Sequence, residues 1–496
     1  MERRADIRHV RLATICLGAL ALAALVAGCG SASPVPGGAS SVVPATVPAY
    51  IALDSDAGSS QWRTADELAS RFPDREKGVA ALERSLRNDA GLDFDADVRP
   101  ALGPEIDIVW LDLDHRGNDV VALMQPRDEA AFERAVAKGN ANDPSSPLVY
   151  ETVGDWEVMS DQRSKIAEFK TMASRGGPML ADDPSFSQAM SEYSGESLVK
   201  AYVNGAQVMD KARSSIPADA TKLLDKLGTL DWLAASVRVT PEGVRLDTTV
   251  RGRAGSLFRS GSTGSGDNSF EPSLPGLIPH DALAYVAFQG VGGTFSSVES
   301  NPALASPQFA PVRDILRKVG ELLAGEDALY VRRGERQIPE VTLVTEPSSG
   351  TDGAATLDRI LGGTKLASGI ERSVVAGVEA RTLRLGNGVG LHYANVGGNL
   401  VVSDLVAGIA DLANGGPTLT RSETYSDAIH ASGAPPKVEG LVYVDVRGGL
   451  DLVRRLSNAP VPSGVEHNLG PLRSAVAYAA SRPSEVQVTF FVRVTG

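Results

Sequence analysis

Cysteine is almost absent from this 496-residue chain, which contains only Cys16 and Cys29. Cys16 lies within an apolar N-terminal run and Cys29 follows that run, so no thiol is left for the globular part of the chain. Disulfide bonds, zinc–thiolate sites and a cysteine nucleophile are therefore excluded there. A chain of this length can bury enough apolar surface to fold without such cross-links.

Basic runs are missing as well. The chain has 48 Lys and Arg against 61 Asp and Glu, a formal charge of −13. Residues 1–28 hold four Arg and two acidic residues, which leaves 44 basic and 59 acidic residues, or −15, for the remainder. An acidic body repels nucleic acid and anionic lipid, so we expect no nucleic-acid partner.

Histidine is too sparse and too scattered for a local catalytic or metal-binding motif. The five histidines beyond residue 28 are His115, His280, His392, His430 and His467. No H-E-x-x-H, G-x-S-x-G or phosphate-binding G-x-x-x-x-G-K-[ST] pattern occurs, and Gly386-Asn387-Gly388 lacks the third glycine of a dinucleotide fingerprint. The sequence predicts no catalytic residue, no metal site and no cofactor, and it favours a non-enzymatic protein.

The N-terminus has the order of an export signal. Four arginines precede the uncharged run from Leu12 to Val26, which at about 15 residues is shorter than the roughly 20 that a membrane-spanning helix needs. The run ends in Leu25-Val26-Ala27-Gly28-Cys29, which resembles the bacterial lipobox. We predict that residues 1–28 are a lipoprotein signal peptide, that Cys29 carries the lipid, and that the protein sits at the outer face of the cytoplasmic membrane.

Composition divides the rest of the chain. Residues 29–48 are uncharged and rich in Ser, Pro and Gly, which predicts a flexible tether. Residues 253–278 contain a second such stretch and predict a linker between a first domain, 49–252, and a second, 279–496. Each domain falls within the usual size range.

The two halves repeat one another. Val158 to Asp161, Gly176-Gly177-Pro178, Phe186 and Val199 to Val203 are echoed by Val401 to Asp404, Gly415-Gly416-Pro417, Tyr425 and Leu441 to Val444. Ala49 to Ala52 likewise matches Ala284 to Ala287. The order and spacing predict an internal duplication.

Hairpin and helix patterns alternate in each half. Ile106 to Leu113 with Asp119 to Met124, and Leu233 to Thr240 with Val244 to Arg251, predict antiparallel hairpins. Asp128 predicts the cap of a helix over 129–138. We expect an α+β fold of two related domains, each a mainly antiparallel sheet with helices on one face.

Several of these segments together resemble a known family. The segments are Tyr50 to Asp54, Gln61-Trp62, Arg71-Phe72-Pro73, Asp93-Phe94, Asp97 to Gly103 and Ser160-Asp161. They are similar to the bacterial domain-of-unknown-function family 3352, whose members are typically exported or membrane-attached. The resemblance extends from about Tyr50 to the C-terminus, although the second half lacks the Trp and the Phe-Pro pair. It implies architecture and location, and no catalytic residue.

Three local patterns have a structural explanation. Asp93, Asp95 and Asp97 have the spacing of a calcium loop, but Val98 and Pro104 stand where its glycine and glutamate belong, so Asp97 is expected to cap a helix. The Ser160-Asp161 and Ser403-Asp404 pairs are also expected to be helix caps. The four tryptophans, of which Trp62 is expected to be the least buried, are assigned to the core of the first domain.

These features favour a lipid-anchored binding or scaffolding protein of the cell envelope. Its expected partners are the membrane, reached through the lipid, and a protein, an apolar ligand or a cell-wall ligand held on or between the domains. Two alternatives stay open. An exported hydrolase with a site of paired carboxylates would show a cleft with two acidic side chains of raised pKa, whereas a structural spacer would have no well-formed pocket.

Overall fold

The computed structural model describes residues 38–114, 118–215, 229–252, 269–292, 310–334, 339–362, 369–386, 389–456 and 462–496. The chain forms two compact units, of which the first extends to Ser256 and the second begins at Leu257. The boundary falls within the predicted linker, 253–278. Cys29 and the signal segment lie outside the described residues, as does His115.

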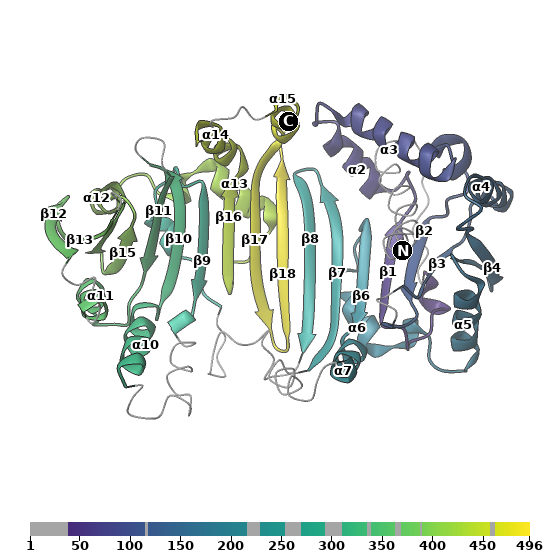
Figure 1. The fold of residues 1–496 in the computed structure, drawn as a ribbon, viewed down its shortest axis with the longest axis horizontal. Helices are drawn as coiled ribbons and strands as arrows, with labels where there is room; N and C mark the ends of the chain where they lie inside the picture. The colour runs from purple at the N-terminus through teal and green to yellow at the C-terminus, as the bar shows by residue number, and fades with distance from the viewer. Residues whose placement is uncertain are drawn as a thin grey trace. The chain divides into compact units, whose positions relative to one another are not determined.

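The first unit is built on one antiparallel sheet with the strand order β4-β5-β3-β2-β1-β6-β7-β8 (Figure 1). The strands are β1 (Ala49–Asp54), β2 (Glu105–Trp110), β3 (Val120–Met124), β4 (Val149–Val153), β5 (Trp156–Ser160), β6 (Val199–Asn204), β7 (Leu230–Thr240) and β8 (Gly243–Gly252). Both predicted hairpins, β2–β3 and β7–β8, are confirmed.

Helices and short turns connect these strands. The helices are α2 (Ser60–Ala69), α3 (Arg75–Ala90), α4 (Glu129–Asn142), α5 (Arg163–Ser174), α6 (Pro184–Ser191) and α7 (Gly205–Ser215), with short helical turns η2 (Ala39–Ser41), η3 (Phe94–Val98) and η5 (Leu180–Asp182). The side chain of Asp128 accepts a hydrogen bond from the Ala131 amide, which confirms the predicted cap, although α4 continues to Asn142.

The sheet of the first unit is covered on both faces, not on one as the sequence suggested. Val121 and Leu123 of β3 pack into a core cluster with Ile166 of α5, whereas Ala122 and Met124 pack into a second cluster with Phe132 of α4. Alternate side chains of a strand point to opposite faces, so a helical layer lies on each side. The apolar run Val120–Met124 is the sequence signal of a strand buried on both faces.

The segment Gly38–Pro48 is folded, so the prediction of a flexible tether over 29–48 is wrong for these residues. Ala39, Val43 and Val47 are fully buried in the core of the first unit. The Val43 carbonyl accepts a hydrogen bond from the Leu180 amide, and the Ala45 amide donates to the Pro178 carbonyl. Serine- and proline-rich composition did not exclude packing because alanine and valine alternate with those residues.

The second unit has an antiparallel sheet with the strand order β12-β13-β14-β15-β11-β10-β9-β16-β17-β18 (Figure 1). The strands are β9 (Ala284–Gln289), β10 (Glu326–Arg333), β11 (Pro339–Thr345), β12 (Ile370–Val375), β13 (Val378–Gly386), β14 (Val389–Val396), β15 (Asn399–Ser403), β16 (Gly440–Asp445), β17 (Leu472–Arg482) and β18 (Glu485–Val494). The expected turn at Gly386 to Gly388 falls between the paired strands β13 and β14, but Asn387 and Gly388 lie outside the described residues.

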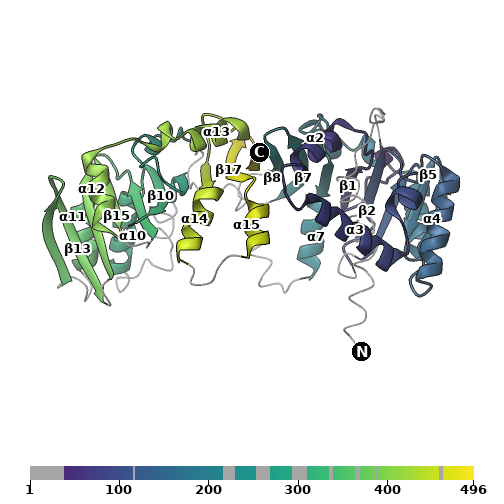
Figure 2. The ribbon, with the colours of Figure 1, turned by 90° about the horizontal axis from the view of Figure 1, so that it is seen from above.

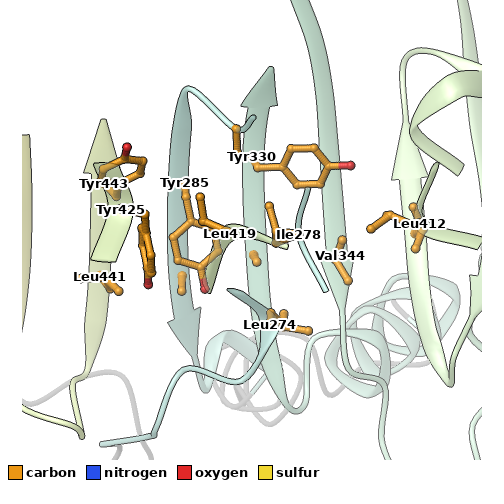
Figure 3. Close-up of a cluster of buried hydrophobic side chains, with 14 of the residues drawn as sticks. Leu274, Ile278, Tyr285, Tyr330, Val344, Leu412, Leu419, Tyr425, Leu441 and Tyr443 are labelled. Carbon is orange, nitrogen blue, oxygen red and sulfur yellow. The ribbon is translucent and has the colours of Figure 1, made fainter. Parts of the chain in front are cut away.

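The helices of the second unit are α10 (Ala310–Leu322), α11 (Gly353–Gly362), α12 (Val406–Asn414), α13 (Glu423–Ser432), α14 (Val446–Leu456) and α15 (Ser463–Leu469), with turns η7 (Leu274–Gly276) and η12 (Leu419–Arg421). Figure 2 shows α13 and α14 on opposite sides of β17, which both of them contact. The main core of the second unit contains Tyr285, Tyr330 and Tyr443 (Figure 3).

The predicted repeat corresponds to a shared architecture. Strands β14, β15, β11, β10, β9, β16, β17 and β18 of the second unit follow the order of β4, β5, β3, β2, β1, β6, β7 and β8 of the first. An edge-to-face aromatic triad recurs in both cores, formed by Tyr50, Phe186 and Tyr202 in one and by Tyr285, Tyr425 and Tyr443 in the other (Figure 3). The added strands β12 and β13 distinguish the second unit.

Part of the predicted linker also belongs to the second unit. Phe270 and Ile278 are buried in its core, and Phe270 forms a β-bridge with Val438. The Leu419 amide donates to the Ile278 carbonyl, as the Leu180 amide does to the Val43 carbonyl in the first unit.

Among the described residues, no helix has the length and apolarity needed to cross a membrane.

Candidate functional site: an acidic pocket in the first unit

A cavity of about 370 Å³ opens in the first unit at the end of β1 and the start of β2. Its wall includes Asp54 at the end of β1, Glu105 at the start of β2 and Lys200 from β6. Asp56 and the following turn, together with residues 194–197 before β6, complete one side. The volume lies in the range that binds small molecules.

The turn after β1 is held together by the carboxylates that line the cavity. Asp54 accepts a hydrogen bond from the Ser59 hydroxyl at 2.6 Å and from the Asp56 amide at 3.0 Å. Asp56 accepts from the Gly58 amide and forms an ion pair with Arg127 at 3.2 Å. Ser59 also caps α2 by accepting from the Trp62 amide. These contacts fix Asp54 and Asp56 at the cavity wall.

Sheet register places three acidic side chains on one face. Asp54 lies directly opposite Glu105 in the β1–β2 pair, and Asp107 follows Glu105 two residues later on the same face. Directly opposite residues of an antiparallel pair have Cβ atoms about 4.5–5.5 Å apart. Asp54 and Glu105 therefore lie side by side at the cavity wall, and the Glu105 side chain forms a hydrogen bond with Asp107 behind it.

Burial makes the charged forms of these acids unfavourable. The pKa of Asp54 is raised to about 6, chiefly by burial. The hydrogen bonds that Asp54 accepts from Ser59 and Asp56 oppose this rise, and the neighbouring Asp56 and Glu105 charges add to it. Burial also raises the pKa of Glu105, and the hydrogen bond with Asp107 and the positive charge of Lys200 partly offset this rise. The pKa of the fully buried Asp107 is raised well above its usual value by burial and by the Glu105 charge. The pocket thus holds carboxylates that its own cations do not fully neutralise.

The N-terminal segment closes the inner side of this acidic group. Tyr50 donates a 2.5 Å hydrogen bond from its hydroxyl to Asp107, which also accepts from the Ala39 amide. Gly38 lines the cavity with a φ of 42°, and a Cβ atom at this position would lie 2.4 Å from Glu105 Oε1. Only glycine fits both the left-handed backbone and this close approach.

The second unit shows that the fold does not require these charges. The sheet registers place Gln289 at the position of Asp54, Ala328 at that of Asp107 and Leu441 at that of Lys200. Glu326 retains the position of Glu105, but its carboxylate is buried and accepts hydrogen bonds from the Ser273 hydroxyl and from the Ser273 and Leu274 amides. The acidic pocket is a property of the first unit.

The serine–aspartate pairs do not cap helices as predicted. Ser160 and Ser403 are buried strand ends; Ser160 donates to the Val120 carbonyl, and Ser403 accepts from Thr342. Asp161 accepts from Lys165, and Asp404 accepts from the Val341 amide. Helices α5 and α12 begin without a side-chain cap. The pairs instead tie the end of one strand to its neighbour.

The other candidate residues are dispersed. Asp93, not Asp97, caps the η3 turn by accepting from the Asp95 and Ala96 amides, and Asp97 pairs with Lys138. Within the described ranges no three His, Cys, Asp or Glu side chains are placed to hold a metal ion. His280, His430 and His467 are exposed, whereas His392 contacts Thr382.

The tryptophans differ from expectation in one respect. Trp62, Trp156 and Trp232 are buried, whereas Trp110 is only half-buried, so Trp110 and not Trp62 is the least buried. The Trp62 indole N–H donates to the Asp54 carbonyl at 2.9 Å, which explains its burial. Trp156 lies at the wall of the acidic pocket.

Sequence reasoning missed the acidic pocket although a signal for it was present. In Glu105-Ile-Asp107-Ile-Val109, acidic residues alternate with isoleucines within a strand, so the acids share a face with the apolar Val109. Lys200 likewise stands inside the strand Val199–Asn204. Charges inside a strand that is buried on both faces are costly and mark candidate sites.

No protein-family model matches the chain, and no curated protein matches it. Among solved structures, crystal form IV of TP0453 is similar, with 15% identity, a TM-score of 0.25 and coverage of 43% of this chain and 78% of that chain. Crystal form III shares 16% identity with a TM-score of 0.25, and crystal form I shares 13% with a TM-score of 0.24; each match covers 45% of this chain and 80% of the other. TM-scores this low assign neither a fold family nor a function to this chain.

Proposed function

We propose that this chain is a lipid-anchored protein of the cell envelope whose first unit binds a small polar ligand in the acidic pocket. The anchor is supported by the basic and apolar N-terminal segments that end in Leu25-Val26-Ala27-Gly28-Cys29. The resemblance to the domain-of-unknown-function family 3352 is part of the same proposal. The ligand site is supported by one observation above all: a cavity faced by Asp54 and Glu105, whose charged forms are held at a cost.

A site of this kind has a functional rather than a structural origin. The second unit builds the same strands with Gln289, Ala328 and Leu441 in place of the charged residues, so stability of the fold does not explain them. Natural proteins keep such unfavourable groups where a ligand uses them. The presence of a cavity also favours a ligand-binding protein over a structural spacer.

Mass spectrometry of the full-length protein, expressed in a bacterial host and extracted in mild detergent, tests both parts. The denatured protein should carry acyl chains on Cys29, and the Cys29→Ala variant should carry none and leave the membrane fraction. The native protein should carry a small non-covalent mass that Glu105→Gln loses. The matched control is Glu242→Gln, at the exposed β7–β8 turn. An unmodified Cys29 contradicts the anchor, and a native mass equal to the covalent mass contradicts the ligand site.

A carboxylate-based hydrolase is the second candidate, favoured by the facing pair of Asp54 and Glu105. Asp54, with a pKa of about 6, can donate a proton near neutral pH, and Glu105 is placed to act on the same substrate. Glycosidases use carboxyl pairs about 5–10 Å apart. Release of nitrophenol from a panel of 4-nitrophenyl glycosides, lost in both Asp54→Asn and Glu105→Gln, would support hydrolysis. Binding of a ligand without release of nitrophenol would support the binding function and not hydrolysis.

A further inference from the structure

We propose that the ligand of the acidic pocket carries a protonated primary amine on a small hydroxylated skeleton, with the ammonium group bound between Asp54 and Glu105. This inference rests on the proposed function and specifies its ligand class. It follows from the charge, the unused acceptor and the lining of the cavity.

The charge of the wall selects a cation. Four carboxylates line the cavity, from Asp54, Asp56, Glu105 and Glu196, with two cations, Lys200 and the exposed Arg63, and Arg127 pairs with Asp56. The Lys200 amine is itself half-buried, and burial lowers its pKa. An anion would meet four carboxylates against two cations in a partly desolvated site, whereas a bound ammonium group would reduce the excess negative charge beside Asp54 and Glu105.

An unused acceptor points in the same direction. Asp56 is only 5% exposed, and its buried Oδ2 atom has no hydrogen-bond partner among the described residues, although its Oδ1 atom has two. A buried carboxylate oxygen without a partner costs free energy, and a donor that reached this oxygen would lower that cost. An ammonium group has three donors and no acceptor, which suits a wall of carboxylate oxygens.

The remaining lining indicates the skeleton. Hydroxyl-bearing Ser60, Ser194 and Ser197 lie around the cavity, and Trp156 contributes an aromatic surface. Hydroxyl groups both donate and accept, so they match a ligand with several hydroxyls. The volume of about 370 Å³ accommodates a molecule the size of a monosaccharide.

Isothermal titration calorimetry on the full-length protein in detergent tests the inference with charge-matched pairs. The probes are glucosamine against glucose, and ethanolamine against ethylene glycol. At pH 7 each amine should bind at least tenfold more tightly than its neutral counterpart. Asp54→Asn and Glu105→Gln should each weaken the amine about ten- to hundredfold, as expected for loss of a charged hydrogen-bond partner. The controls Asp155→Asn and Glu242→Gln, in exposed turns, should bind as the native protein does.

Three outcomes overturn the inference. Equal binding of amine and neutral probes, abolished by Glu105→Gln, rejects the ammonium but leaves the ligand site. Displacement of the amine by calcium or magnesium chloride at micromolar concentration would make the pocket a metal site instead. No binding of any probe rejects the inference, and if the native protein also carries no small mass, the proposed function fails with it.

Discussion

Replacing Asp54 by asparagine should stabilise the first unit at neutral pH. The pKa of Asp54 is raised from 3.8 to about 6. Because the folded value lies above the unfolded one, the protonated acid is favoured by folding, and this stability is present below pH 3.8 and lost as the pH rises to about 6. Above that pH Asp54 is ionised in the folded protein, and its partly desolvated charge lowers the free energy of unfolding.

The size of the effect follows from the shift. About two pKa units correspond to about 3 kcal/mol at 1.36 kcal/mol per unit. Asp54 is half-buried and solvent screens part of its charge, and asparagine loses one of two acceptors, so we expect a gain of about 1–2 kcal/mol. For a domain of this size, this raises the melting temperature by roughly 2–8 °C.

Tryptophan fluorescence is the appropriate assay because all four tryptophans belong to the first unit. Melting curves at pH 4, 5, 6 and 7.5 should show a difference between Asp54→Asn and the native protein that grows up to about pH 6 and then stays constant. Asp155→Asn, in an exposed turn, should show no such growth. A destabilisation of equal size at every pH would refute the reasoning, because it would mean that hydrogen bonds and not charge decide the stability at this position.

Four further substitutions test other contacts. Glu326→Ala should lower the stability of the second unit by about 3 kcal/mol, measured by circular dichroism, because it leaves buried amides without an acceptor; an unchanged melt would contradict this role. Tyr202→Phe should leave stability unchanged or raise it by about 1 kcal/mol, since its buried hydroxyl has no partner in the part of the chain that the structure describes. Tyr50→Phe should instead lower stability by about 1–2 kcal/mol, because the Tyr50 hydroxyl donates to Asp107; equal effects of the two substitutions would contradict this reasoning. Gly38→Ala should weaken ligand binding and lower the melting temperature, because its Cβ would collide with Glu105; native-like values of both would show that the N-terminal segment can shift freely.

Much of the fold could be predicted from local patterns. Alternating apolar residues and turn signals identified the hairpins, and Asp128 identified a helix start. The repeat also aligned Tyr50, Phe186 and Tyr202 with Tyr285, Tyr425 and Tyr443, but that these rings meet in each core is seen only in the structure.

Charges inside strands mark Glu105, Asp107 and Lys200 as unusual, but the sequence does not show that they form a pocket with Asp54, because that depends on register between distant strands. Asp54 meets Glu105 only through pairing of β1 with β2, and Lys200 joins them only because β6 pairs with the other edge of β1. Sequence spacing contains neither pairing. The helix caps assigned to Ser160 and Ser403 failed for a related reason, since the neighbouring strand competes for those hydroxyls.

Folding of the chain from Gly38 onward limits how far the pocket can move from the membrane. If Cys29 carries the proposed lipid, eight residues, 30–37, lie between the anchor and Gly38 at the pocket wall, so nine Cα–Cα steps join the two. A fully extended chain spans at most about 3.3–3.6 Å per residue, so the leash is about 30 Å long at full stretch. With so short a segment between the anchor and its wall, the pocket stays in the water layer next to the bilayer and reaches little of the space beyond it. Its ligands would then be those that are released, displayed or consumed at that surface.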